Sequence, residues 1–184
     1  MEEHTLIQRA SQGDEQAFTQ LVERYQNQVY RQALRMLNHP EDAADVTQEV
    51  FLKAWRNLPA FRRDSSLSTW LYRLTDHAAI DLLRRERKRQ GDASLDDAAQ
   101  ELAAQIPCPA PTPEQAAERQ ELRRAVTQGL AQLPLEQRRV LVLRELQGLS
   151  YEEMAGLLSL PLGTVKSRVA RARLALAKLL GDHR

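Results

Sequence analysis

Hydrophobic residues in the first half of the chain recur every three or four positions, which is the spacing of one face of an α-helix. This pattern predicts a short helix near the N-terminus, a long helix from Ala17 to Leu37 and a third helix from about Glu41 to Trp55. Ser68 or Thr69 can cap a fourth helix, because a hydroxyl can accept a hydrogen bond from a free amide at a helix start. Strand signals are almost absent, so residues 1–89 are predicted to form one all-helical domain.

The same spacing returns in residues 114–184, which are predicted to form a second small helical domain. Its first helix, from about Glu114 to Gln132, is expected to turn Leu122 inward. The next helix is expected to start with Pro134 near its first position, where a missing N–H costs nothing. Gly148 fits the left-handed residue that ends a helix.

Two shorter elements close this domain. Ser150 and Glu153 have the spacing of a capping box, in which each side chain accepts a hydrogen bond from the backbone amide of the other residue. Thr164 is expected to cap a last helix that reaches about Leu180. A short helix, a turn and a second amphipathic helix form the pattern of a helix-turn-helix.

The segment between the two domains, residues 90–113, has a different composition. It is acidic, and four prolines fall within residues 107–113. Proline fixes the dihedral φ and favours extended backbone. We therefore predict an all-α protein with two small helical domains joined by an acidic, Pro-rich, flexible linker.

Composition and charge narrow the class of protein. No apolar run among the 184 residues approaches the roughly 18 that a membrane helix needs, the N-terminus lacks the apolar stretch of a secretory signal, and Cys108 has no second cysteine to pair with. We therefore expect a cytoplasmic protein. The net charge of +1 hides two basic blocks, residues 62–89 at +4 and 122–184 at +6, beside acidic segments. These blocks favour two surfaces for nucleic acid, although solvated helix faces would give the same pattern.

The last predicted helix has a face that suits duplex DNA. Opposite its apolar stripe lie Lys166, Ser167, Ala170 and Arg171. Arg can bond guanine with two hydrogen bonds, Ser can bond a base edge or a phosphate, and Ala permits close approach to a thymine methyl group. Arg168 and Arg173 flank the stripe and are expected to hold phosphates. A solvated basic helix is the alternative, but the helix-turn-helix pattern favours DNA reading.

The basic block of the first domain suits single-stranded nucleic acid instead. Cations and aromatic residues alternate there, namely Phe61, Arg62, Trp70, Tyr72, Arg84 and Arg85. Bases stack on aromatic rings while cations follow the phosphates. The spacing of Trp70 favours a place in the core, whereas Phe61 and Tyr72 are expected at the surface. A solvated helix end is the alternative reading of the basic block.

The predicted helix 41–55 has a polar outer face that includes one leucine. This face carries Asp42, Asp45, Gln48, Glu49, Leu52 and Lys53. An outward Leu among carboxylates slightly favours a protein-docking face over a face that only serves solubility. The four histidines are scattered, and the chain has no Gly-rich phosphate loop, nucleophile elbow or metal-binding motif. We therefore expect no enzyme activity, no cofactor and no metal site.

Segments of this chain resemble, in the same order, parts of the bacterial RNA polymerase sigma factors of the extracytoplasmic-function group. Residues 13–18 resemble the opening of region 2.1, and residues 41–55 resemble region 2.2, which binds the β′ clamp helices of the polymerase. Residues 61–73 resemble the segment that opens the promoter −10 element. Residues 148–155 and 163–168 resemble region 4, which reads the −35 element. The resemblance covers nearly the whole chain and implies a sigma factor.

The resemblance also implies a role for each surface. The candidates for polymerase docking are Asp42, Asp45, Gln48, Glu49 and Leu52. The candidates for opening the −10 element or capturing a base are Phe61, Arg62, Trp70, Tyr72, His77, Arg84 and Arg85. The candidates for −35 reading are Lys166, Ser167, Arg168, Ala170, Arg171 and Arg173. The implied partners are core RNA polymerase (β′ clamp helices and β flap), promoter DNA and an anti-sigma factor, which could hold the protein at the inner membrane face without membrane insertion.

Two positions depart from the family pattern. His77 stands where relatives often carry Asn, and Ser159 stands where many helix-turn-helix proteins carry Gly. Two other interpretations of the chain remain open at this point. One is a stand-alone helix-turn-helix regulator whose first domain senses a signal or dimerises. The other is an adaptor that binds polymerase without reading DNA.

Overall fold

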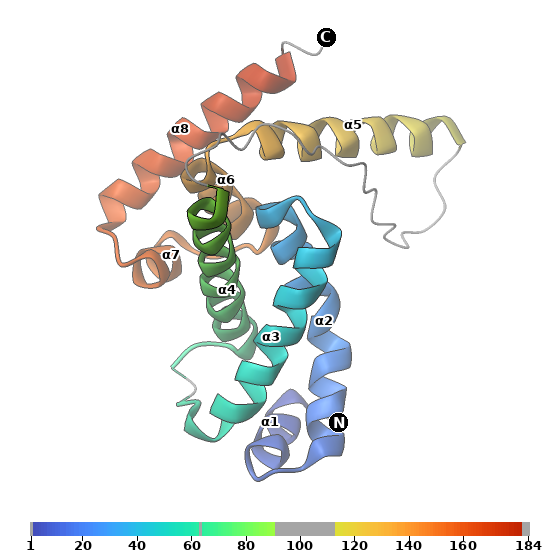
Figure 1. Ribbon diagram of the computed structural model, residues 1–184, viewed down its shortest axis with the longest axis vertical. Coiled ribbons are helices and arrows are strands. Elements are labelled where there is room, and N and C mark those ends of the chain that lie inside the picture. Colours follow the sequence, from blue (N-terminus) through green and yellow to red (C-terminus); the bar gives the residue numbers. More distant parts are fainter. Residues whose placement is uncertain (1, 63, 91–112, 182–184) are drawn as a thin grey trace. The chain divides into compact units, whose positions relative to one another are not determined.

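The computed structural model of the chain describes residues 2–62, 64–90 and 113–181 (Figure 1). Helices dominate these residues, and no strand occurs among them. They belong to two compact units, one within residues 1–96 and one within residues 97–184. The prediction of two all-helical domains is therefore confirmed. Most of the predicted linker, residues 91–112, lies outside the described residues.

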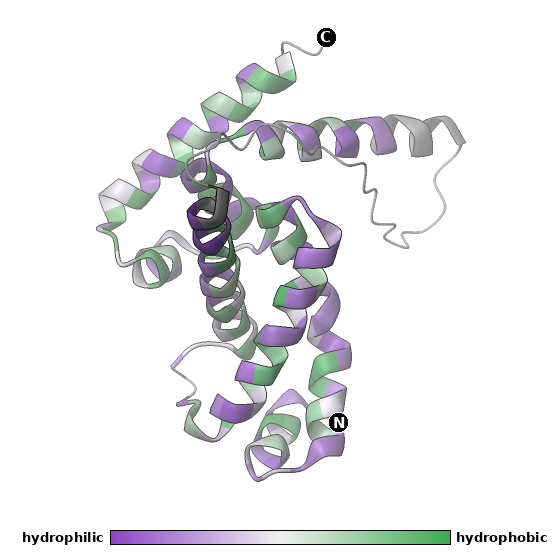
Figure 2. Ribbon diagram, viewed as in Figure 1, coloured by the Kyte–Doolittle hydropathy of each residue, from purple (hydrophilic) through white to green (hydrophobic). Residues whose placement is uncertain are grey.

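The first unit is built around one long central helix. Its elements are α1 (Glu3–Ser11), α2 (Glu15–Leu37), α3 (Pro40–Asn57), the 3-10 turn η1 (Leu58–Ala60) and α4 (Leu67–Gln90). Helix α2 packs against α1, α3 and α4, and α3 also packs against α4. Hydrophobic and hydrophilic residues alternate along these ribbons, as they do in amphipathic helices (Figure 2). Their apolar faces form a core that includes Leu6, Leu21, Val29, Val50 and Leu58.

Polar side chains set where the helices of the first unit begin. The Asp14 carboxylate caps α2 by accepting a hydrogen bond of 3.0 Å from the Ala17 amide. This bond, together with a 2.7 Å bond from Arg9 Nε, holds the pKa of Asp14 below its usual value. At α4 the cap is Ser66, whose hydroxyl accepts from the Thr69 amide at 3.1 Å. The predicted cap at Ser68 or Thr69 is therefore wrong by two or three residues.

Buried polar contacts tie α2 to its neighbours. The Tyr72 hydroxyl donates to Gln28 Oε1 at 2.9 Å, and Gln32 Nε2 donates to the Tyr72 carbonyl oxygen at 3.1 Å. Burial raises the pKa of Tyr72, whose residue is only 8% exposed. The prediction that Tyr72 lies at the surface is therefore wrong. Through its hydroxyl and its carbonyl oxygen, Tyr72 ties α4 to α2.

The second unit has fewer residues than the first, and its other helices pack against its last helix. Its elements are α5 (Pro113–Gln132), α6 (Leu135–Leu141), the π-helical turn η2 (Val142–Leu146), α7 (Tyr151–Leu158) and α8 (Leu162–Gly181). Helix α8 packs against α5, α6 and α7. Val140, Leu143, Met154, Val165 and Val169 are completely buried. No helix in residues 2–62, 64–90 and 113–181 is both long and apolar enough to cross a membrane.

Two predicted features of the turns in the second unit are confirmed. The Ser150–Glu153 capping box is present, and Gly148 has φ +68° as predicted. Ser159 adopts the left-handed conformation, with φ 52°, that glycine would favour, so it ends α7 in the usual way.

Two other predictions about this unit are wrong, whereas Pro134 is close to its predicted place. It is the N-cap residue of α6, with an extended ψ of 142°, one position before the first helical residue, Leu135. Thr164 lies inside the first turn of α8, which begins at Leu162. Leu122, which is predicted to turn inward, is 63% exposed.

An arginine completes the C-terminal end of α5. Arg138 of α6 donates from Nε to the Leu130 carbonyl oxygen at 2.8 Å, and from Nη2 to the carbonyl oxygens of Ala131 and Leu133. The last carbonyls of a helix have no partner within the helix, so a cation placed there satisfies them and also suits the helix dipole. Burial lowers the pKa of Arg138. This side chain fixes the turn between α5 and α6.

Candidate nucleic-acid and partner interfaces

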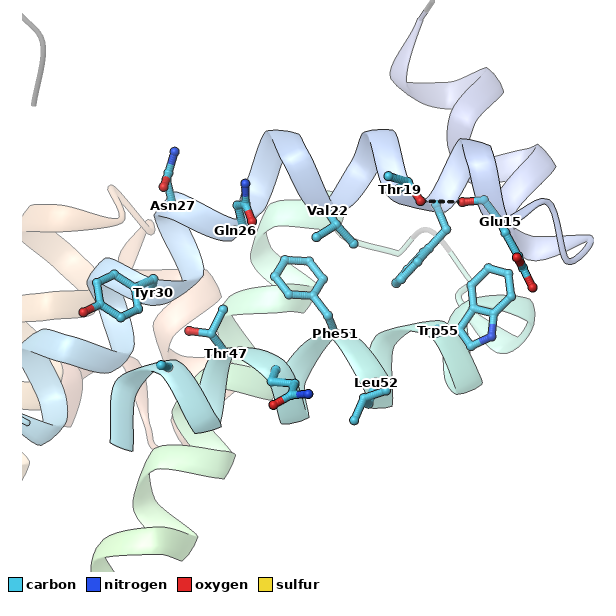
Figure 3. A pocket seen from close by; sticks show the side chains of 13 residues that line it. Glu15, Thr19, Val22, Gln26, Asn27, Tyr30, Thr47, Phe51, Leu52 and Trp55 are labelled. Atoms are coloured by element: carbon cyan, nitrogen blue, oxygen red, sulfur yellow. Dashed lines mark hydrogen bonds between the residues drawn. The ribbon is translucent and has the colours of Figure 1, made fainter. Parts of the chain in front are cut away.

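An apolar groove of about 640 Å³ runs along the first unit between α2 and α3. Figure 3 shows Phe51 of α3 pointing toward Val22 of α2 across this groove. At one end the rings of Phe18 and Trp55 lie 4.8 Å apart at 54°. Leu52 also lines the groove, and it is 52% exposed. Such a surface, apolar and open to solvent, can take up the apolar side of another helix.

Of the five predicted docking residues, two line this groove, and Asp42, Asp45 and Glu49 lie elsewhere on α3. Gln48 and Leu52 line it, and Asp45 is exposed on the same helix. Two predicted carboxylates contact nearby side chains: Glu49 pairs with Lys53 of α3 at 2.5 Å, and a carboxylate oxygen of Asp42 lies 3.1 Å from Nδ1 of His39, the residue before α3.

Sequence reasoning missed the α2 half of the groove. Phe18 and Val22 follow the apolar stripe of a core helix, so no sequence signal separated them from the core. On α3, by contrast, Leu52 stands outside the stripe and marked the surface.

A second candidate surface lies where η1 leads into α4. The rings of Phe61 and Trp70 lie 5.0 Å apart at 34°, and both are partly buried against the core. The Ser66 hydroxyl lies 2.8 Å from Ser68 Oγ and 2.9 Å from Thr69 Oγ1, which fixes the other end of the loop. Arg62 between these two anchors is exposed.

The remaining predicted residues of this surface lie along α4. His77, Arg84 and Arg85 are exposed, and Arg84 Nη1 is 3.9 Å from the Asp81 carboxylate. Tyr72, as described above, is buried and does not belong to the exposed surface. Arg63 lies outside the described residues.

The third candidate surface is the outer face of α8. Lys166, Ser167, Ala170 and Arg171 are all exposed, as predicted, while Val165, Val169 and Ala172 are buried beneath them. The Ser167 hydroxyl donates to the Thr164 carbonyl oxygen at 2.9 Å. Two cations lie over the ring of Tyr151 in α7: the Arg144 guanidinium is 4.6 Å and Lys166 Nζ 5.8 Å from the ring centre. Such cation–π contacts hold a cation in place while leaving its charge available.

The two flanking arginines have carboxylate partners inside the unit. Arg168 Nη1 lies 3.1 Å from Glu136 Oε2. Arg173 donates from Nε and Nη2 to the same oxygen of Glu145, at 2.9 and 2.6 Å, and this contact raises the pKa of Arg173. Sequence reasoning missed these pairs, because the partners are 32 and 28 residues apart.

Two segments of the chain match known protein families. Residues 21–89 match the family described as sigma-70 region 2, and residues 123–176 match sigma-70 region 4. The RNA polymerase sigma-H factor of Pseudomonas aeruginosa is 39% identical over 181 residues, which cover 97% of this chain and 94% of that protein. The ECF RNA polymerase sigma-E factor of Escherichia coli is 38% identical over 95% of this chain and 92% of its own length. The chain belongs to the ECF sigma factors.

A solved structure supports the same assignment for this sigma factor. It is similar, with a TM-score of 0.69 and 26% identity, to the sigma factor RpoE of Bartonella quintana, whose structure was determined in complex with the anti-sigma factor NepR. The match covers 91% of this chain and 98% of RpoE. Sigma factors are transcription initiation factors and not enzymes themselves. The assignment favours a sigma factor over both a stand-alone regulator and an adaptor.

The family regions coincide with the surfaces described above. Region 2 of this sigma factor contains the α3 side of the groove and the whole of the Phe61–Trp70 surface, whereas region 4 contains the exposed face of α8. The α2 side of the groove begins at Glu15, a few residues before the matched segment. Among the residues that the structure describes, no three His, Cys, Asp or Glu side chains lie close enough together to hold a metal ion.

Proposed function

We propose that this sigma factor binds core RNA polymerase through its first unit and reads two promoter elements, the −35 element as duplex and the −10 element as an opened strand. The observation that carries the proposal is the outer face of α8, where cations, a hydroxyl and a small residue are exposed together on a helix-turn-helix. A helix of this kind fits the major groove, and its side chains are the types that bond base edges.

The groove between α2 and α3 is the proposed docking site for the β′ clamp helices. The floor of this groove is apolar and aromatic, which supplies binding energy when a partner helix covers it. Exposed polar groups at Asp45 and Gln48 border the groove and can fix the orientation of the partner. Asp42 and Glu49 do not line the groove, and this proposed docking site does not include them. A further contact is proposed between the second unit and the β flap.

The loop after η1 and the exposed side of α4 are the proposed site for the opened −10 strand. Phe61 and Trp70 pack on one another and anchor the loop, and their rings can receive an unstacked base. Arg62, His77, Arg84 and Arg85 are exposed and can follow the strand. Tyr72 does not contact DNA in this proposal. It holds α4 on α2.

We also propose that an anti-sigma factor regulates this chain. The similar RpoE was solved bound to one, and an open apolar groove on the polymerase-binding face offers a surface that such a partner could cover. The place of action is the cytoplasm, where RNA polymerase works. A membrane-bound anti-sigma factor would hold the chain at the inner face of the membrane without inserting it.

Replacing Arg171 with Ala is expected to weaken binding to a selected −35 duplex by about 1–3 kcal/mol, because one base-edge contact is lost. Fluorescence anisotropy with the full chain measures this change against the wild type. The matched control is Arg123→Ala, which removes an exposed arginine of α5 and is expected to leave the affinity unchanged. An equal loss on every duplex, whatever its sequence, would mean that Arg171 contacts only phosphate.

A further inference from the structure

Between residues 166 and 173, helix α8 carries four cations that differ in their surroundings. Lys166 and Arg171 lie on the exposed face, and neither forms an ion pair with any described residue. Arg168 and Arg173 lie on the flanks, and each is paired with a carboxylate from another element of the unit. The helix therefore presents two unpaired cations on its outer face and two neutralised cations at its edges.

The two carboxylates come from different places in the sequence but act in the same way. Glu136 belongs to the first turn of α6, and its Oε2 is 3.1 Å from Arg168 Nη1. Glu145 belongs to the π-helical turn η2, and its Oε1 accepts two hydrogen bonds from Arg173. A carboxylate has thus been brought to each flank of α8 independently.

Folding gives little reason for these pairs. All four side chains are at least one third exposed, the lowest value being 35% for Arg168. Ion pairs in such surroundings contribute little to stability, because water screens both charges. The two carboxylates nevertheless contact Arg168 and Arg173. These two arginines lie beside the DNA-reading face of α8, a position that suits phosphate binding.

Phosphate contacts supply the part of DNA binding that does not depend on sequence, since each neutralised phosphate releases a counterion. An arginine already held by a carboxylate has its charge partly neutralised, so it attracts a phosphate less strongly than an arginine without such a partner. The carboxylate itself lies beside the DNA backbone and repels it. Both effects act at the flanks of α8 and leave the base contacts of its outer face unaltered.

We propose that Glu136 and Glu145 limit the affinity of α8 for DNA phosphates. The inference rests on the proposed function, in which α8 enters the groove of a duplex. Its consequence is that the second unit does not hold DNA of arbitrary sequence by itself. Tight binding is reached when the polymerase tethers this unit next to the promoter and raises its effective concentration there.

The test compares the wild type with full-length Glu136→Gln, Glu145→Gln and the double variant on a duplex of mixed sequence. Gln keeps the size of the side chain and removes its charge. Each substitution is expected to tighten binding about threefold to tenfold at low salt, and to steepen the dependence of log affinity on log salt by about one. Glu121→Gln, at an exposed carboxylate of α5, is the matched control and is expected to change neither.

The gain is expected to disappear when Arg168 and Arg173 are also replaced by Ala. Unchanged or weaker binding by the Gln variants, with the wild type binding measurably, would overturn the inference, because the carboxylates would then be neutral or would orient the arginines for DNA. If neither the wild type nor any variant binds a duplex at low salt, the error lies in the proposed function itself. Circular dichroism of each variant checks that its helices are intact.

Discussion

Leu52→Asp is expected to weaken binding of this sigma factor to core RNA polymerase by about tenfold to a hundredfold, a loss of roughly 1.5–3 kcal/mol. Leu52 is 52% exposed in the chain by itself, and it lines the groove between α2 and α3. A partner helix that fills the groove would cover this side chain. A carboxylate in its place loses that apolar contact and must also give up water when the partner binds.

The structure of the first unit should survive this substitution. Leu52 is not among the buried residues of the core, whereas its neighbours Val50 and Phe51 are. The thermal unfolding temperature of the variant is therefore expected to match that of the wild type. Affinity for purified core enzyme can be measured by competition or by co-elution in gel filtration.

The matched control is Leu122→Asp, which places the same charge at an exposed leucine of α5 outside the proposed docking groove. It is expected to bind core enzyme as the wild type does. If Leu52→Asp bound core enzyme with unchanged affinity, the groove would not be the docking site. The aromatic pair at its end would then need another explanation.

Arg138→Met is expected to lower the free energy of unfolding of the second unit by about 2–4 kcal/mol. Arg138 donates to three carbonyl oxygens at and just after the C-terminal end of α5, those of Leu130, Ala131 and Leu133. Methionine fills a similar volume but donates no hydrogen bond, so these carbonyl groups lose the arginine as a partner, while Leu130 keeps the hydrogen bond from the Leu133 amide. The turn between α5 and α6 should loosen, and α8 should lose part of its support.

Two spectroscopic signals distinguish the unfolding of the first unit from that of the second. Both tryptophans of the chain, Trp55 and Trp70, belong to the first unit, so tryptophan fluorescence follows that unit alone, whereas far-ultraviolet circular dichroism follows both. In urea, the variant should lose helical signal earlier than the wild type while its fluorescence transition stays in place. Arg123→Met on α5 serves as the control. Coincident, unshifted transitions in Arg138→Met would show that these hydrogen bonds do not stabilise the unit.

The helices were predictable from sequence because apolar residues with a period near 3.6 occur wherever a helix packs on one side. The residues at which the helices start were harder to predict. Ser66, Ser68 and Thr69 all carry hydroxyls, and any of them could have capped α4. The structure selects Ser66, with the other two as its hydrogen-bond partners.

Residues that touch more than one neighbour were harder to place. Tyr72 lies off the main apolar stripe of α4, yet it is buried because α4 contacts both α2 and α3. Leu122 follows the apolar pattern of α5 but is 63% exposed in the part of the chain that the structure describes. A periodic pattern describes one helix and one face, and it does not state how many other helices surround that helix.

The candidate sites divide in the same way. The exposed residues of α8 follow from the helical period alone, since they lie opposite the residues that must be buried. The carboxylates that hold Arg168 and Arg173 belong to other elements and depend on the tertiary fold. The groove depends on two helices that meet side by side, so only its α3 half, marked by Leu52, could be seen in the sequence.

The decisive experiment is run-off transcription with the purified chain and core RNA polymerase, on a library of templates with randomised upstream sequence. Transcripts are expected from a subset of templates that share two sequence elements, one near −35 and one near −10, and only when the chain is present. No transcript from any template, with a chain that circular dichroism shows to be folded, would contradict the proposed function.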